Sequence, residues 1–179
     1  MKKVLTLVVI IVFGLVTSAT ACFDRQDGPP SMRKRNTTTV LETKDPMLDT
    51  TSYSLSLVSE DGDLSVNVLT KYHKGKKVFF DCMRYLKSYG AYVAEADIKF
   101  DDKRGYTVSI RTSRDHYGAI LTYEDDEADF IKKCLKYKKL QIRLTEYDGG
   151  FVGEITHTFN LSRFQEYYEH MTKLQKKVR

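Results

Sequence analysis

The stretch Tyr92–Ile110, which reads YVAEADIKFDDKRGYTVSI, decides the fold class. An apolar or aromatic residue occupies every second position from Tyr92 to Phe100, and the alternation resumes from Tyr106 to Ile110. A period of two is typical of β-strands that bury one face. The turn-forming segment 101–105, which ends in glycine, separates the two runs. The stretch therefore predicts two neighbouring antiparallel strands.

The same pattern continues on both sides of this stretch. Further short apolar or alternating runs, separated by turn residues, occur at 53–57, 64–68, 78–85, 117–123, 140–144 and 151–160. Such regular spacing favours an antiparallel sandwich or barrel. Helical spacing appears at about 127–138, and a capping box of Ser162 and Gln165 predicts a second helix over 164–174. We expect a mainly β (α+β), sandwich-like single domain over residues 52–179, with two short helices near the C-terminus.

The N-terminus reads as a secretory signal. Lys2 and Lys3 precede the uncharged, mostly apolar run Val4–Val16, and the small residues that follow include an A-x-A pattern at Ala19 and Ala21. The competing interpretation is a transmembrane anchor. The apolar run is too short for that role, because a bilayer core takes about 20 helical residues. We expect a signal peptide over residues 1–21.

The residue after the predicted cut is Cys22, so it is a candidate lipidation site. Bacterial lipoproteins are cut before a cysteine that is then acylated, although Ala19 replaces the leucine of their usual box. Acylation would leave Cys82 and Cys134 as an even pair, which predicts a disulfide between them in an oxidising compartment. The alternatives are plain secretion with an unpaired Cys22 and two buried thiols that never pair. Residues 22–51, with few apolar side chains, predict a flexible tether.

Net charge and the placement of basic residues limit the kinds of partner that the protein can bind. Loss of the signal removes two lysines and lowers the formal net charge from +5 to +3, which is too mild a balance to imply a nucleic-acid partner. One local basic patch is a candidate surface for an anionic partner. Its members are Lys71, His73, Lys74, Lys76 and Lys77.

The sequence shows no constellation typical of an enzyme. The acids of 124–129 followed by lysines fit a solvated helix that complements its own dipole. The four histidines lack the spacing of metal ligands, and no glycine-rich phosphate loop is present, so we expect no metal and no cofactor. Asp115-His116 is the one pair that invites a catalytic interpretation. His157 alternates with Ile155 and Phe159, as a core or interface histidine does.

Two parts of the chain resemble type VI secretion-associated periplasmic proteins of the TagO/VasI class. Asp45–Asp49, followed by the alternating run Ser54–Leu57, resembles the opening of those proteins. Their ending, a short helix, a strand of the form L-x-V-R and a T-x-T-F-D-L-S motif, resembles three segments here: Phe130–Leu135, Leu140–Leu144 and Thr156–Ser162.

The chain departs from that family in lacking tryptophan, in Arg163-Phe164 after the serine, and in lacking a terminal cysteine. Invasion-associated IalB-like exported proteins end in a similar way. Both resemblances imply an exported β-domain.

These observations predict an exported protein, periplasmic and lipid-anchored to a bacterial membrane, that binds an envelope protein and has no enzymatic activity. The TagO/VasI resemblance adds an accessory role beside a secretion apparatus. The alternative is an exported inhibitor or exclusion factor of the phage or plasmid type. An envelope hydrolase is the third interpretation. Gene neighbourhood separates the first two, and Asp115→Ala with His116→Ala tests the third.

Overall fold

The computed structural model describes residues 35–45, 47, 50–70, 76–89, 92–148 and 150–178. The expected signal peptide over 1–21, Cys22 and the first part of the expected tether lie outside the described residues. So do Lys71, His73 and Lys74 of the basic patch.

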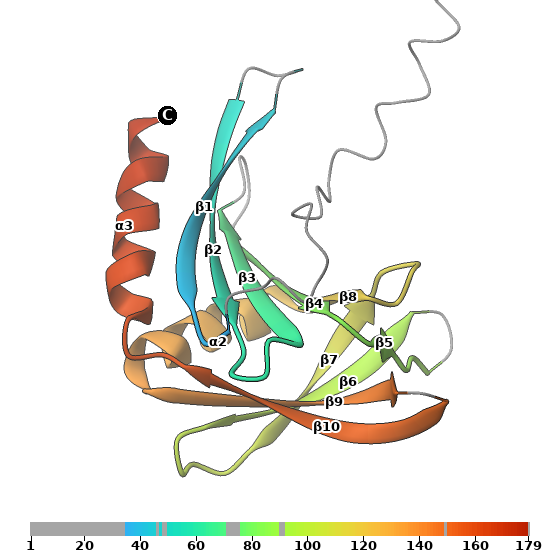
Figure 1. Ribbon diagram of the computed structural model, residues 1–179. Coiled ribbons are helices and arrows are strands. Elements are labelled where there is room, and N and C mark those ends of the chain that lie inside the picture. Colours follow the sequence, from blue (N-terminus) through green and yellow to red (C-terminus); the bar gives the residue numbers. More distant parts are fainter. Residues whose placement is uncertain are drawn as a thin grey trace, which may run out of the picture. The chain divides into compact units, whose positions relative to one another are not determined.

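Ten antiparallel strands and two helices follow one another along the described chain (Figure 1). The strands are β1 (Thr38–Asp45), β2 (Thr50–Val58), β3 (Leu64–Thr70), β4 (Lys76–Cys82), β5 (Tyr85–Leu86), β6 (Val93–Phe100), β7 (Tyr106–Thr112), β8 (Gly118–Leu121), β9 (Lys139–Asp148) and β10 (Phe151–Asn160). The helices are α2 (Glu124–Lys136) and α3 (Phe164–Lys177). The predicted fold class is confirmed.

All ten strands belong to one hydrogen-bonded sheet in the order β1-β2-β3-β4-β8-β7-β6-β9-β10, with the short β5 added to β9. The sheet bends back on itself. The turn between β2 and β3 reaches the far edge, where the Glu60 amide donates to the Thr158 carbonyl at 2.8 Å. A single bent sheet therefore forms the sandwich-like arrangement.

The alternation that decided the fold class sets which side chains face the core. In β6, Ala94, Ala96, Ile98 and Phe100 are buried while the residues between them face outward. β7 lies beside β6 in register, with Ile98 opposite Tyr106. Burial of such apolar faces supplies most of the stabilising free energy of a domain this size, at about 25 cal/mol per Å².

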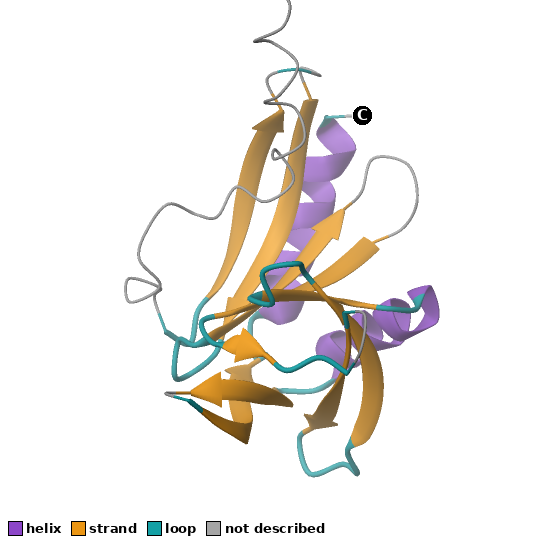
Figure 2. Ribbon diagram, turned by 90° about the vertical axis from the view of Figure 1, so that its right-hand side faces the viewer, coloured by secondary structure: helices purple, strands orange, loops and turns teal. Residues whose placement is uncertain are grey.

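The two helices cover the strands from outside (Figure 2). Phe130 of α2 packs edge-on against Phe80 and Phe100, with ring centroids 6.3 and 5.9 Å apart. α3 packs on β1 and β2 and buries Phe164 and Met171. The predicted capping box is wrong, because Arg163 is the N-cap of α3 and no side chain caps the helix. Neither helix combines the length and apolar content that spanning a bilayer requires.

Part of the expected tether is a strand. Residues 38–45 form β1, which pairs with β2 from Thr38 opposite Leu57 to Asp45 opposite Thr50. Threonine and valine favour the extended backbone, and the partly buried Val40 packs against the core. Within the predicted tether over 22–51, residues 38–45 and 50–51 are therefore strand and not flexible linker.

The predicted disulfide between Cys82 and Cys134 is not formed. Cys82 ends β4 and Cys134 lies on the buried face of α2, where each fills core space as a small apolar side chain does. Burial raises the pKa of the Cys134 thiol well above its ordinary value, which keeps it protonated and unreactive. The prediction rested on the number of cysteines, and that number does not show whether two thiols lie close enough in the fold to form a bond.

Candidate functional site

Five aromatic side chains from three separate parts of the chain gather at one end of the sheet. They are Tyr85, Tyr92, His116, Tyr117 and Tyr147, and we call them the aromatic face. The His116 ring stacks on Tyr85 with centroids 4.6 Å apart, and Tyr85 meets Tyr117 and Tyr147 edge-on at 6.1 and 5.4 Å. The four tyrosines are 36–42% exposed, so each ring is partly covered by its neighbours and partly open to water.

Strand register places these side chains on the outer surface. Tyr85 of β5 lies opposite Tyr147 of β9, and Tyr147 lies opposite Val152 of β10. Their neighbours Leu86 and Glu146 are buried. Because side chains alternate between the two faces of a strand, Tyr85, Tyr147 and Val152 all point outward. At the hairpin tip Val152 is 45% exposed on this face, whereas Phe151, which is 81% exposed, lies on the opposite face of the strand by the same alternation.

The loop between β7 and β8 holds His116 in place. His116 has a positive φ of 61°, a conformation that costs a non-glycine residue free energy. Its amide donates to the Ser113 carbonyl at 3.1 Å, and its carbonyl accepts from the Leu86 amide at 2.8 Å. Within the described part of the chain, His116 Nδ1 is buried without a hydrogen-bond partner. The fold therefore fixes the imidazole against the tyrosines.

The catalytic interpretation of Asp115-His116 finds no support in this loop. The Asp115 carboxylate accepts hydrogen bonds from the Ser113 hydroxyl and from the Tyr117 amide, the latter at 3.2 Å. Since His116 Nδ1 has no hydrogen-bond partner among the described residues, Asp115 does not orient the ring through that nitrogen. The imidazole instead acts as one ring of an aromatic stack.

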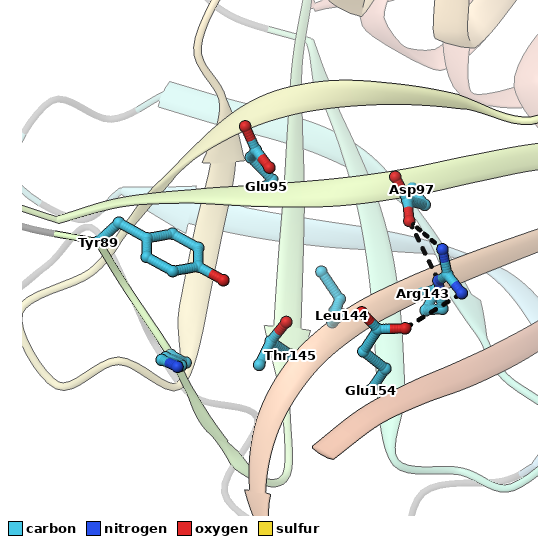
Figure 3. A pocket seen from close by; sticks show the side chains of 8 residues that line it. Tyr89, Glu95, Asp97, Arg143, Leu144, Thr145 and Glu154 are labelled. Carbon is cyan, nitrogen blue, oxygen red and sulfur yellow. Dashed lines mark hydrogen bonds and ion pairs between the residues drawn. The ribbon is translucent and has the colours of Figure 1, made fainter. Parts of the chain in front are cut away.

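A charged strip lies on the outer surface of β6, β9 and β10 (Figure 3), on the face of β9 that also carries Tyr147. Arg143 lies between two carboxylates, 2.5 Å from Asp97 and 3.1 Å from Glu154. The hydrogen bond from Thr107 and then the Arg143 guanidinium lower the pKa of Asp97. The hollow here encloses about 90 Å³, which is small beside the pockets that hold cofactors.

A second histidine lies at the centre of a buried polar network. His157 is fully buried between two carboxylates: Nδ1 is 2.9 Å from Asp61 and Nε2 is 2.7 Å from Glu146. Arg84 lies 3.8 Å from Glu146 and 2.8 Å from Asp63. Burial of the imidazole lowers its pKa. The hydrogen bonds and charges of Glu146 and Asp61 raise the pKa by more than burial lowers it, so the pKa of His157 lies above its ordinary value.

This network is suited to holding the fold together. A general base needs one ring nitrogen free to accept a proton from a nucleophile. Here both nitrogens of His157 face carboxylates, and the Ser59 hydroxyl donates to Asp61 and not to the imidazole. The network joins the turn between β2 and β3, near one edge of the bent sheet, to β9 and β10 at the other edge.

The basic patch is only partly described, and its described members are engaged within the fold. The Lys76 ammonium hydrogen-bonds the Tyr168 hydroxyl and lies over its ring at 4.4 Å. Lys77 forms a 3.0 Å ion pair with the buried Glu127 of α2. These two lysines are therefore tied to the helices, and the prediction that they serve an anionic partner gains no support.

Sequence reasoning missed the aromatic face because its members are far apart in the chain. In the sequence the tyrosines count only as members of alternating runs, and β5, which carries Tyr85, is too short to show a period. The buried network did leave a signal. His157 alternates with Phe159, and Glu146 alternates with Leu144, at core-facing positions. No group of three histidine, cysteine or acidic side chains suited to a metal occurs among the described residues.

The structure is similar to a solved one. The crystal structure of invasion associated protein B from Bartonella henselae matches with a TM-score of 0.54, over 82% of this chain and 98% of that one. The sequences are 10% identical, so the likeness shows a shared fold. No protein-family model and no curated protein matches the sequence. The comparisons thus support the IalB-like part of the predicted resemblance at the level of fold and give no support to the TagO/VasI part.

Proposed function

We propose that this chain is an exported, non-enzymatic binding protein of the bacterial envelope, and that it holds a partner protein through the aromatic face. The observation that carries the proposal is the cluster of exposed tyrosines around His116. Tyrosine is enriched at the centres of protein interfaces, because it offers a large, rigid contact area with few rotatable bonds. An exposed group of this kind on a folded domain marks an interaction site.

The geometry favours a protein partner over a small molecule. The aromatic face is built on strands and a hydrogen-bonded loop, so it is organised before a partner arrives, which lowers the entropic cost of binding. The neighbouring hollow is small and its charges pair with one another. Export is supported by the signal-like N-terminus and by the fold shared with invasion associated protein B.

Crosslinking in living cells tests the binding role. Benzoylphenylalanine placed at position 147 of the full chain is expected to form an adduct with one envelope protein after irradiation. The matched control is position 123, where Tyr123 is 60% exposed and lies outside the aromatic face. Identical adduct patterns from both positions, or none from position 147, would refute a binding role for this face.

Acylation of Cys22 is a separate prediction about the same protein. A palmitate analogue fed to the producing bacterium is expected to label the wild-type chain and to leave Cys22→Ser unlabelled, since only a cysteine thiol at the cut site accepts the lipid. The measurement is gel fluorescence of the purified full chain after coupling of the analogue to a dye. An unlabelled wild-type protein that begins at Cys22 would contradict lipid anchoring and leave plain secretion.

A further inference from the structure

The outer edge of β10 presents unpaired backbone groups beside the aromatic face. β10 is the last strand of the sheet (Figure 1) and pairs with β9 without a bulge from Phe151 to Asn160. The Thr158 carbonyl accepts from Glu60, so the backbone groups of Thr158 point away from β9. Every second residue shares that direction. Val152, Glu154 and Thr156 therefore turn N–H and C=O outward, and within the described part of the chain no backbone group bonds to them.

This edge has little of the usual protection against a further strand, because Glu154 is the one exposed acidic or basic side chain along β10 and it is paired with Arg143. Proteins blunt exposed edges with lysine, proline, bulges or a covering helix. The opposite edge, β1, carries the ion pair of Lys44 with Glu42 at 3.6 Å and lies against α3. β10 contains no lysine or proline, and the side chains of Phe151, Val152, Glu154 and Thr156 are exposed.

We propose that an extended segment of the envelope partner adds to the sheet as a strand along residues 151–156 of β10. This inference rests on the proposed function and names how the partner is held. A run of six residues matches the common length of a β-strand, about 5–6 residues. In strand addition the main-chain hydrogen bonds supply affinity and alternate side chains supply specificity.

The chemistry of the neighbouring side chains specifies the incoming segment. Val152 lies opposite Tyr147, so an aromatic or β-branched residue placed across from Val152 extends the aromatic face. Two residues further along, Glu154 belongs to the trio with Arg143 and Asp97, in which one cation faces two carboxylates. A lysine or arginine across from Glu154 neutralises the remaining negative charge.

A second copy of this chain fits the edge less well. Antiparallel pairing of two β10 strands centred on the exposed run places Glu154 directly opposite Glu154 of the other copy, and like charges in that position are destabilising. Moving the centre by one residue toward Asn160 pairs Val152 with Thr158, whose carbonyl Glu60 already occupies. A foreign segment with a basic residue meets neither obstacle.

The test uses benzoylphenylalanine at position 152 of the full chain, with two substitutions at Glu154. Glu154→Pro removes an outward N–H and sets a ring on the edge while keeping the bonds to β9. Glu154→Ala is the matched control, because it removes the same ion pair with Arg143 and leaves the N–H. We expect Glu154→Ala to lower the position-152 adduct by up to about fivefold, because the opposing cation loses its carboxylate. Glu154→Pro is expected to lower it about tenfold below Glu154→Ala, the upper range for one lost hydrogen bond.

Each other result has a defined meaning. An adduct in Glu154→Pro as strong as that in Glu154→Ala, or an adduct from position 147 with none from position 152, overturns strand addition and leaves the proposed function standing. An adduct with the mass of two copies of this chain overturns the foreign segment. Absence of adducts from both positions overturns the proposed function as well. If Glu154→Pro fails to fold by circular dichroism, hydrogen exchange of the wild-type complex decides. Strand addition requires protection of the Val152, Glu154 and Thr156 amides, and unchanged exchange overturns it.

Discussion

Replacing His157 with alanine is expected to lower the free energy of unfolding by about 3–5 kcal/mol, as measured by urea denaturation at pH 6. The imidazole is fully buried and lies within hydrogen-bond distance of Asp61 and Glu146. Its removal leaves the carboxylate of Glu146, which is buried, with the more distant Arg84 at 3.8 Å. An unpaired buried charge is among the most destabilising defects a domain can carry.

The control is His170→Ala on the exposed surface of α3, where a change within about 0.5 kcal/mol is expected. If both alanine variants change the free energy of unfolding by similar small amounts, the network does not hold the sheet ends together. His157→Gln separates charge from packing, because it restores part of the volume and one hydrogen bond but no positive charge.

The same network sets a dependence of stability on pH. The pKa of His157 is raised in the folded state, so its stabilisation is complete below about pH 6.5, the ordinary value, and is lost as the pH rises through the folded-state pKa. The pKa of Asp61 is lowered: burial raises it, but hydrogen bonds from Ser59 and Asp63 and the charge of His157 lower it more. Its stabilisation is present above its ordinary pKa and is lost as the pH falls through the folded-state pKa.

The free energy of unfolding is therefore expected to fall between pH 6 and pH 8 in the wild type, and this fall should be reduced in His157→Gln. Equal slopes in the two proteins would show that His157 is not the group responsible.

Periodicity predicted the fold well because alternation reports burial directly. The run Tyr92–Phe100 became β6 and its neighbour became β7, and both predicted helices exist with ends shifted by a few residues. β1 was missed because apolar and polar residues alternate only weakly along it. Its strand conformation depends on hydrogen bonds to β2, which a local pattern does not show. The disulfide was wrong because counting cysteines says nothing about where β4 and α2 place them.

The candidate site was far less predictable than the fold. Tyr85, His116 and Tyr147 become neighbours only through the pairing of β5 with β9 and the loop before β8. These are long-range contacts, and no local pattern encodes them. His157 was recognised as a core or interface residue, yet its partners Asp61 and Glu146 come from two other elements and are identified only by the bent sheet.

The double variant Tyr85→Ala/Tyr147→Ala carries the largest expected effect on binding. The two rings meet edge-on at 5.4 Å at the centre of the aromatic face, and truncation of a central interface tyrosine costs about 2 kcal/mol or more. Because the rings are only 37% and 38% exposed and contact one another and His116, the double variant is expected to lose about 1–3 kcal/mol of unfolding free energy and to remain folded. Loss of binding without loss of folding is the signature of an interface residue.

The affinity of this double variant for the envelope protein crosslinked from position 147 tests the central claim most directly. Surface plasmon resonance with the purified full chain is expected to show a dissociation constant at least about 30-fold above that of the wild type. Tyr123→Ala, the matched exposed control, is expected to leave it unchanged. A double variant that binds within twofold of the wild type, while remaining folded, would contradict the aromatic face as the binding surface.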